Sequence, residues 1–109
     1  MENQTDIEKI KEIISITLKN DGIHSSRIYL FGSRARGDFS SSSDYDVLIV
    51  SKKKVGIKEK IKLFSKLRRL LAKKRYNVDI VIKSAAEVNY YKDKTGHIVR
   101  SALREGIIL

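Results

Sequence analysis

Three aspartates in this sequence have the chemistry and spacing of a magnesium site. Asp44 and Asp46 lie two residues apart at the start of an apolar run, and Asp79 lies within a second such run. Side chains two apart on a β-strand point to the same side, so Asp44 and Asp46 project together if the run is a strand. With Asp79 on a neighbouring strand, three carboxylates would hold one or two Mg²⁺ ions, with Mn²⁺ as the alternative ion. We therefore expect these acids to be both catalytic and metal-binding.

A glycine and a serine stand before these acids, at the end of another apolar run. Residues 27–31 are β-branched, aromatic or long side chains, and Gly32 and Ser33 follow directly. A glycine lets the backbone approach a phosphate closely, and a serine donates from its hydroxyl and its amide. Gly32 and Ser33 are therefore candidates for binding the phosphates of a nucleoside triphosphate.

The elements that must position these residues follow from the periodicity of the apolar residues. Thr5 and Glu8 fit a capping box, which favours a first helix from about Asp6 to Lys19. The other predicted elements are strands at 27–31, 45–50 and 78–82, a short turn and loop at 33–43, a helix at 95–106, and a helix whose core stripe is Ile57, Ile61, Phe64, Leu67, Leu70 and Leu71. This order predicts one α/β (α+β) domain over residues 1–109, with a small mixed β-sheet and helices packed on one face.

The formal net charge of +10 is concentrated in one segment. Residues 52–75 hold twelve lysines and arginines against one acid, Glu59. The bases that lie off the apolar stripe of the predicted helix are Lys58, Lys62, Lys66, Arg69 and Lys73. A solvated face is the favoured interpretation and docking of an acidic protein comes next; direct nucleic-acid binding through Lys58–Lys74 is a less favoured alternative.

Several classes of protein do not fit the composition. The chain has no cysteine, which excludes disulfides and thiolate metal sites. It contains no apolar run near the roughly 20 residues that span a bilayer, so we expect no membrane partner. Residues 1–10 are acidic and polar, unlike a secretion signal, which predicts a cytoplasmic protein.

The spacing of these motifs resembles a known family. Gly32-Ser33, ten residues and then Asp44-Tyr45-Asp46 is similar to the GS-x10-DxD signature of minimal nucleotidyltransferases, within the DNA-polymerase-beta-like superfamily. The resemblance extends over about 7–106 and implies the nucleotidyltransferase fold. It also implies that the third acid of the family corresponds to Asp79. Within the motif, Arg36 matches a basic residue of the family and Ser43 adjoins the acids, so both are expected to bind nucleotide.

The resemblance further implies a reaction and a partner. Family members of this size are commonly the antitoxin of a pair whose toxin is a HEPN-domain ribonuclease, and some add AMP from ATP to a toxin tyrosine. We therefore expect a Mg²⁺-dependent nucleotidyltransferase that uses ATP and modifies a HEPN toxin. Two alternatives stay open: a catalytically silent antitoxin that occludes its toxin, and a transferase for a small molecule such as an aminoglycoside. A chain of 109 residues has little room for an acceptor domain, which favours an acceptor presented by another protein.

Overall fold

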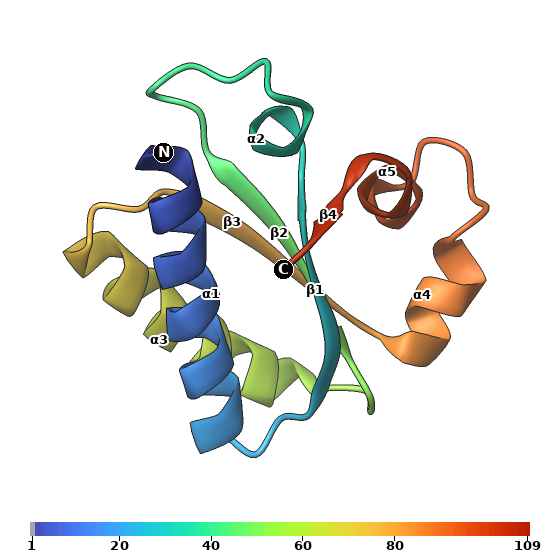
Figure 1. Cartoon of the computed structure of the whole chain (residues 1–109). Coiled ribbons are helices and arrows are strands. Elements are labelled where there is room, and N and C mark those ends of the chain that lie inside the picture. Colours follow the sequence, from blue (N-terminus) through green and yellow to red (C-terminus); the bar gives the residue numbers. More distant parts are fainter. Residues whose placement is uncertain (1) are drawn as a thin grey trace.

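The chain forms a four-stranded mixed sheet with helices on both faces (Figure 1). The structure is a computed structural model that describes residues 2–109, with side chains from Thr5 onward except that of Ser26. The elements in chain order are α1 (Glu2–Asn20), β1 (Ser25–Phe31), α2 (Ser33–Arg36), β2 (Tyr45–Ser51), α3 (Ile57–Lys73), β3 (Val78–Ser84), α4 (Ala85–Tyr91), α5 (Ile98–Glu105) and β4 (Ile107–Ile108). The three predicted strands are confirmed, each within two residues of its predicted bounds.

The strand order β3-β2-β1-β4 makes β2 and β1 the central strands. β1 pairs antiparallel with β2 and with β4, whereas β2 pairs parallel with β3. A parallel pair needs a long crossover, which α3 provides. Every residue of β2 is buried except Asp46, because elements cover both faces of this strand.

One face of the sheet is covered by α1 and α3. Their buried side chains recur every four residues, which places them on one stripe of each helix. These residues are Ile10, Ile14 and Leu18 of α1, and Leu63, Leu67 and Leu71 of α3. They pack on Val47 and Ile49 of β2 and form the larger core.

The opposite face is covered by α4 and α5, which corrects the prediction that helices pack on one face. Phe31, Leu48 and Val50 form a second apolar cluster with Ala102 of α5, and Val88 of α4 packs against it. Side chains alternate along a strand, and both alternating sets of β2 are apolar. Both faces therefore need cover, as is usual where a strand reads as a continuous apolar run.

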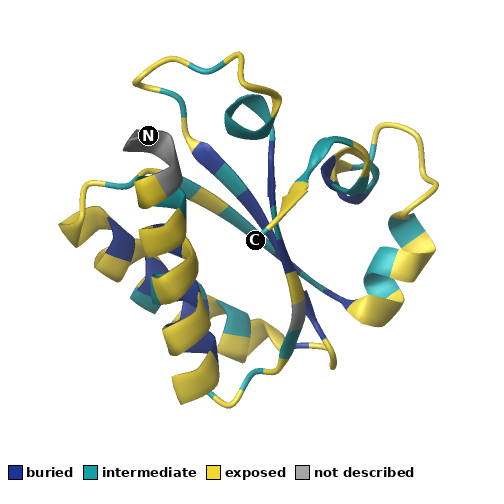
Figure 2. Ribbon diagram, in the orientation of Figure 1, coloured by how far each residue is buried: buried dark blue, intermediate teal, exposed yellow. Residues whose placement is uncertain are grey.

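The predicted stripe of α3 is wrong in part, and exposed residues occupy much of this helix (Figure 2). Ile57 and Ile61 are 78% and 63% exposed, and Leu70 is 38% exposed. Leu63, which the prediction left out, is fully buried. The helix carries apolar residues over a wider arc than the sheet and α1 can cover, so spacing alone did not identify the buried set.

Helix boundaries also differ from the prediction. α1 already begins at Glu2, so Thr5 lies inside the helix and cannot cap it. The last helix begins at Ile98 rather than near Thr95, and its N-cap is His97, whose Nδ1 accepts from the backbone N–H of Val99 at 3.1 Å.

Two elements were not predicted, α4 and β4. A capping box begins α4: the N–H of Glu87 donates to Ser84 Oγ at 3.2 Å, and the N–H of Ser84 donates to Glu87 Oε1 at 3.0 Å. In β4 the backbone of Ile107 and Ile108 pairs with β1, while both side chains stay exposed. Between residues 2 and 109, no helix is long and apolar enough to cross a membrane.

Candidate active site

The candidate acids lie at one end of the sheet, where β1 ends and where β2 and β3 begin. β1 ends at Phe31, whose register partner on the antiparallel strand β2 is Asp46. The parallel strand β3 places Asp79 in register with Asp46. Two acids separated by a helix in the sequence are therefore neighbours on adjacent strands.

Asp46 and Asp79 also face the same side of the sheet, the side covered by α4 and α5. Leu48, two residues after Asp46, packs in a cluster with Ala102 of α5. Val81, two residues after Asp79, packs against the same cluster. Because side chains two apart on a strand share a face, the two carboxylates lie beyond the end of this apolar cluster.

Gly32 follows β1 and touches the carboxylate of Asp46. Its φ of 73° lies in the left-handed region, which a glycine adopts without strain. A Cβ at this position would collide with Oδ2 of Asp46 and lie 3.1 Å from its Cγ. The backbone therefore approaches the acid more closely than any other residue type would allow, and phosphate binding by Gly32 stays a prediction.

Asp46 lies in an electrostatic environment that disfavours its charge. Partial burial raises the pKa of its carboxyl, and repulsion from Asp79 and Asp44 raises the pKa further. Arg36 acts in the opposite direction, and Glu105 again raises the pKa of Asp46. A cation bound at these acids would relieve the repulsion.

The three predicted metal ligands differ in exposure. Asp44 and Asp79 are exposed, whereas Asp46 is half-buried. Among residues 5–109, no three His, Cys, Asp or Glu side chains are gathered closely enough to hold a metal ion by themselves. Mg²⁺ is commonly held by one or two carboxylates, with substrate phosphates and waters as its other ligands. The donor chemistry fits Mg²⁺ in that form, with phosphate oxygens completing the set.

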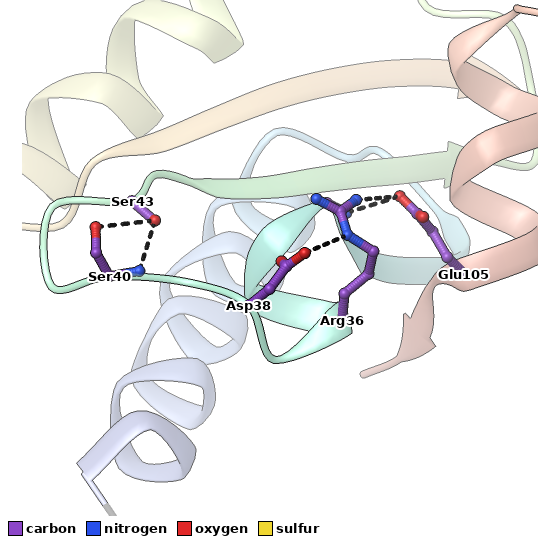
Figure 3. Close-up of polar contacts among 6 residues, drawn as sticks. Arg36, Asp38, Ser40, Ser43 and Glu105 are labelled. Carbon is purple, nitrogen blue, oxygen red and sulfur yellow. Dashed lines mark hydrogen bonds and ion pairs between the residues drawn. The ribbon is translucent and has the colours of Figure 1, made fainter.

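A fourth acid, Glu105, lies at the Gly32 turn, and sequence reasoning missed it (Figure 3). Its Oε1 accepts from the backbone N–H of Gly32 at 3.3 Å and from Arg36 Nη1 at 3.1 Å. Arg36 also donates to Asp38 through Nε at 3.2 Å. Asp38 and then Glu105 raise the pKa of the Arg36 guanidinium. Arg36 thus lies beside the turn, where it is shared between two acids, and its binding of nucleotide stays a prediction.

The two predicted serines have different surroundings. Ser33 is half-buried and begins α2 directly after Gly32. Ser43 lies in the following loop, where its Oγ accepts from the backbone N–H of Ser40 at 3.0 Å (Figure 3). The carbonyl of Ser43 accepts from Arg34 Nη2 at 3.0 Å. Ser43 therefore braces the loop that leads to the acids.

A groove adjoins the acids on the side of β3, the free edge strand. Its part nearest the acids has a volume of about 240 Å³ and is lined by Asp44, Asp79, Arg68, Leu71, Ala72, Tyr76, Asn77 and Val78. A second part, of about 400 Å³, shares Arg68 and Asp79 and continues to Phe64 and Ile80. Arg68 of α3 is a site residue that the sequence analysis did not single out, because nothing in its spacing separates it from the neighbouring bases.

Comparison with known proteins agrees with this geometry. The family model for "Polymerase beta, Nucleotidyltransferase" matches residues 8–109. A candidate protein adenylyltransferase of Methanocaldococcus jannaschii is 46% identical over 57 residues, which are 52% of this chain and 54% of that protein. This chain thus matches about half the length of that relative.

Solved structures show the same fold. A candidate minimal nucleotidyltransferase is 25% identical with a TM-score of 0.63, over 100% of this chain and 97% of its own. A candidate nucleotidyltransferase from Sulfolobus solfataricus is 24% identical with a TM-score of 0.60, over 96% and 82% of the two chains. A Shewanella oneidensis complex of tri-AMPylated HEPN toxin with MNT antitoxin matches at 20% identity and a TM-score of 0.52, over 97% and 70%.

The family model spans nearly the whole chain, including the Gly32 turn and the strands that carry Asp46 and Asp79. The chain therefore belongs to the polymerase beta nucleotidyltransferase family.

Proposed function

We propose that this protein transfers AMP from ATP to a hydroxyl of a partner protein, in a Mg²⁺-dependent reaction. The observation that carries the proposal is the register pairing of Asp46 with Asp79 beside the close approach of Gly32. Two carboxylates next to a turn that favours phosphate form the arrangement that nucleotidyl transfer needs. The relative from M. jannaschii, named as a candidate protein adenylyltransferase, supports a protein acceptor.

The nucleotide is assigned to the turn after β1. The backbone and hydroxyl of Ser33 and the N–H of Gly32 would donate to the triphosphate, and Arg36 would neutralise part of its charge. Ser43 would act by holding the 40–43 loop near the acids. These donors bind phosphate rather than base, which leaves the preference for ATP as an expectation from the family.

Asp44, Asp46 and Asp79 would hold Mg²⁺ together with phosphate oxygens of the nucleotide. The ion supplies positive charge that stabilises the attacking and leaving oxygens of the transfer. The acids of this chain contribute the negative charge that selects a hard cation and fixes its place. Mn²⁺ would be accepted by the same oxygen ligands.

The acceptor would enter from the groove along β3, next to Asp79. Its hydroxyl oxygen bonds to the α-phosphorus, while the bond from this phosphorus to the bridging oxygen breaks and pyrophosphate leaves. The hydroxyl proton passes to Asp79, which is exposed and lines both parts of the groove. Positioning of the two reactants contributes much of the rate in such reactions.

We further propose that the acceptor is a tyrosine of a HEPN ribonuclease toxin, so that this protein acts as an antitoxin. Support comes from the fold, which is shared with the S. oneidensis antitoxin bound to its tri-AMPylated toxin. A catalytically silent antitoxin and a transferase for an aminoglycoside-type molecule are the alternatives. In this role the protein is expected to work in the cytoplasm, where its toxin and ATP would both be present.

The deciding experiment uses ATP labelled at either the α- or the γ-phosphate. Wild-type protein and Mg²⁺ are incubated with each label and with a HEPN-domain protein from the same organism, and protein-bound radioactivity is measured. Label from the α-phosphate alone is expected, since only AMP is transferred. An Asp44→Ala, Asp46→Ala double variant serves as the inactive control. Binding of the partner without label from either position would support the silent antitoxin instead.

A further inference from the structure

Glu105 occupies the hydrogen-bond donors that the proposed function assigns to the triphosphate. One oxygen, Oε1, accepts from the backbone N–H of Gly32 at 3.3 Å and from Arg36 Nη1 at 3.1 Å (Figure 3). A carboxylate oxygen and a phosphate oxygen are both anionic acceptors that form charge-assisted bonds with such donors. The two anions therefore compete for one place.

The backbone around Glu105 is held firmly against β1. Gly106 donates from its N–H to the carbonyl of Ala102 at 2.8 Å, and a Cβ on Gly106 would lie 3.2 Å from the carbonyl of Leu30. The next two residues pair with β1 as β4, and Leu109 donates to the carbonyl of Ile28 at 2.9 Å. The α-carbon of Glu105 is thus fixed close to the turn at the end of β1.

The side chain of Glu105 is less constrained than its backbone. It is 32% exposed, and its partner Arg36 is 45% exposed. A rotation about the side-chain bonds would release both donors without unfolding α5, because exposed side chains change rotamer rapidly. Glu105 also stands near Asp46, so the donors Gly32 and Arg36 hold it in a site that is otherwise acidic.

We propose that the carboxylate of Glu105 acts as an internal substitute for a phosphate group. A nucleoside triphosphate must displace this carboxylate from Gly32 and Arg36 in order to bind. This inference rests on the proposed function and adds a residue that sets affinity and specificity. A triphosphate carrying Mg²⁺ brings enough charge to replace the carboxylate, whereas AMP brings less. After transfer, the carboxylate returns to the same donors and favours release of pyrophosphate.

The test compares Glu105→Gln with wild type by calorimetry, using Mg²⁺ with ATP, AMP or pyrophosphate as the ligands. Glutamine keeps the size of the side chain and weakens the bonds that it accepts. We expect ATP and pyrophosphate to bind about tenfold more tightly, since the ligand then displaces weaker hydrogen bonds than those a carboxylate accepts. AMP should gain less. Unchanged or weaker ATP binding would overturn the inference, and weaker binding would identify Glu105 as a residue that positions Arg36.

Two control variants test whether tighter binding comes from the lost contact of Glu105 with its donors or from the loss of one negative charge. Glu12→Gln removes an exposed acid of α1, on the other face of the sheet, and should leave affinity unchanged. Glu105→Asp keeps the charge but shortens the side chain, so it should also bind ATP more tightly. If Glu105→Asp matches wild type while Glu105→Gln is tighter, long-range charge explains the effect and the inference fails. Circular dichroism of each variant establishes that α5 is folded.

The amide resonance of Gly32 gives a readout that is independent of activity. In ligand-free protein it should shift in Glu105→Gln, and Mg²⁺ with pyrophosphate should shift it in wild type. If ATP binds every variant equally, the inference about Glu105 fails while the proposed function stands. If ATP binds neither to wild type nor to any variant, the inference and the proposed function both fail, because no triphosphate then displaces Glu105.

Discussion

Asp46 and Asp79 are register partners on the parallel strands β2 and β3, so their carboxylates start from neighbouring positions on one face of the sheet. Adjacent strands lie about 4.8 Å apart, a distance at which like charges repel. The repulsion is visible in the raised pKa of Asp46, to which burial and then Asp79 contribute most. A site built in this way favours a bound cation.

ATP should bind to the wild-type protein only when Mg²⁺ or Mn²⁺ is present. Without a cation, the phosphates meet Asp44, Asp46 and Asp79 as like charges. Calorimetric titration with ATP in Mg²⁺ buffer and again with excess EDTA measures the difference. Equal affinity in the two buffers would remove the metal from the proposal.

Asp46→Asn should lower the rate of AMP transfer more than ~100-fold. It should also make the metal-free protein more stable at neutral pH. The folded protein holds the Asp46 proton more tightly than the unfolded chain does, because its pKa is raised above the usual 3.8. Ionisation therefore destabilises wild type as the pH rises from about 3.8 through the raised pKa. The advantage of the variant should grow over that window and then stay constant.

Urea unfolding of the wild type and of Asp46→Asn from pH 3 to pH 8 measures this advantage. Asp93→Asn, which changes an exposed acid in the loop before α5, is the control and should show no such trend. Mg²⁺ should stabilise wild type and leave Asp46→Asn nearly unaffected. If Asp46→Asn is unfolded by circular dichroism, then Asp46 has a structural role that we did not assign to it.

Gly32→Ala should be both less stable and inactive. An alanine at a φ of 73° costs about 1–2 kcal/mol, and its Cβ would collide with the Asp46 carboxylate. Gly22→Ala is a matched control, because Gly22 has a φ of 71° and a Cβ there would meet no atom within 4 Å. Thermal melts should show a smaller loss of stability in Gly22→Ala, which lacks the collision, and the α-labelled ATP assay should show loss of transfer in Gly32→Ala alone. Full activity of Gly32→Ala would contradict the close approach.

Ser84→Ala should destabilise the protein by about 1 kcal/mol, because it removes the cap of α4. The hydrogen bond from the Ser84 backbone contributes most to lowering the pKa of Glu87 below its usual 4.5, and the bond to the Ser84 side chain adds to it. An acid with a lowered pKa stabilises the fold above 4.5, and that contribution is lost as the pH falls through the folded value. Thr5→Ala is the control, because Thr5 fits the same motif but lies within α1. Equal losses in both variants, measured by urea unfolding at pH 7, would argue against a capping role for Ser84.

Reversing the charge of Lys58 and Lys62 should slow association with the partner by about tenfold at low salt and change dissociation little, because rim charges mainly steer encounter. Both lysines are exposed on α3 beside the exposed Ile57 and Ile61, whereas Lys66 is engaged by Asp21 at 2.5 Å. Surface plasmon resonance at several salt concentrations measures the rates.

The same reversal at Lys9 and Lys11, on α1, is the control for net charge, and ATP affinity should not change in either variant. Unchanged association would mean that the basic surface of α3 is only solvated. Loss of ATP binding would instead place this surface in the nucleotide site.

Much of the site could be predicted because its parts are local in sequence. Gly32 and the two acids at the start of β2 belong to one turn and the strands around it, so their spacing implies their geometry. Asp79 was found because a charge inside a strand-like run is unusual. Glu105 was not, since 69 residues separate it from Arg36 and an acid at a helix end resembles any surface residue.

The errors in the fold have the same origin. Ser84 and Glu87 form the capping motif that begins α4, and Thr5 and Glu8 show the same pattern inside α1. The motif describes a local preference, and the position of each helix on the sheet decides whether it is used. By spacing alone, Ile57 and Ile61 also look like core residues. Both are exposed because the sheet and α1 cover only part of the apolar arc of α3.

The parallel pairing of β2 with β3 has a consequence for the order in which the chain folds. Asp44, Asp46 and Gly32 come together through the antiparallel pair β1 and β2, whose contacts are short in sequence. Asp79 arrives only after α3 has crossed the sheet and β3 has docked, a step that closes a longer loop and is slower. An incompletely folded chain would thus have the proposed nucleotide turn without Asp79, the acid proposed to face the acceptor. Catalytic competence would report that β3 is in place, and pulse-labelled hydrogen exchange during refolding should show β3 protected after β1 and β2.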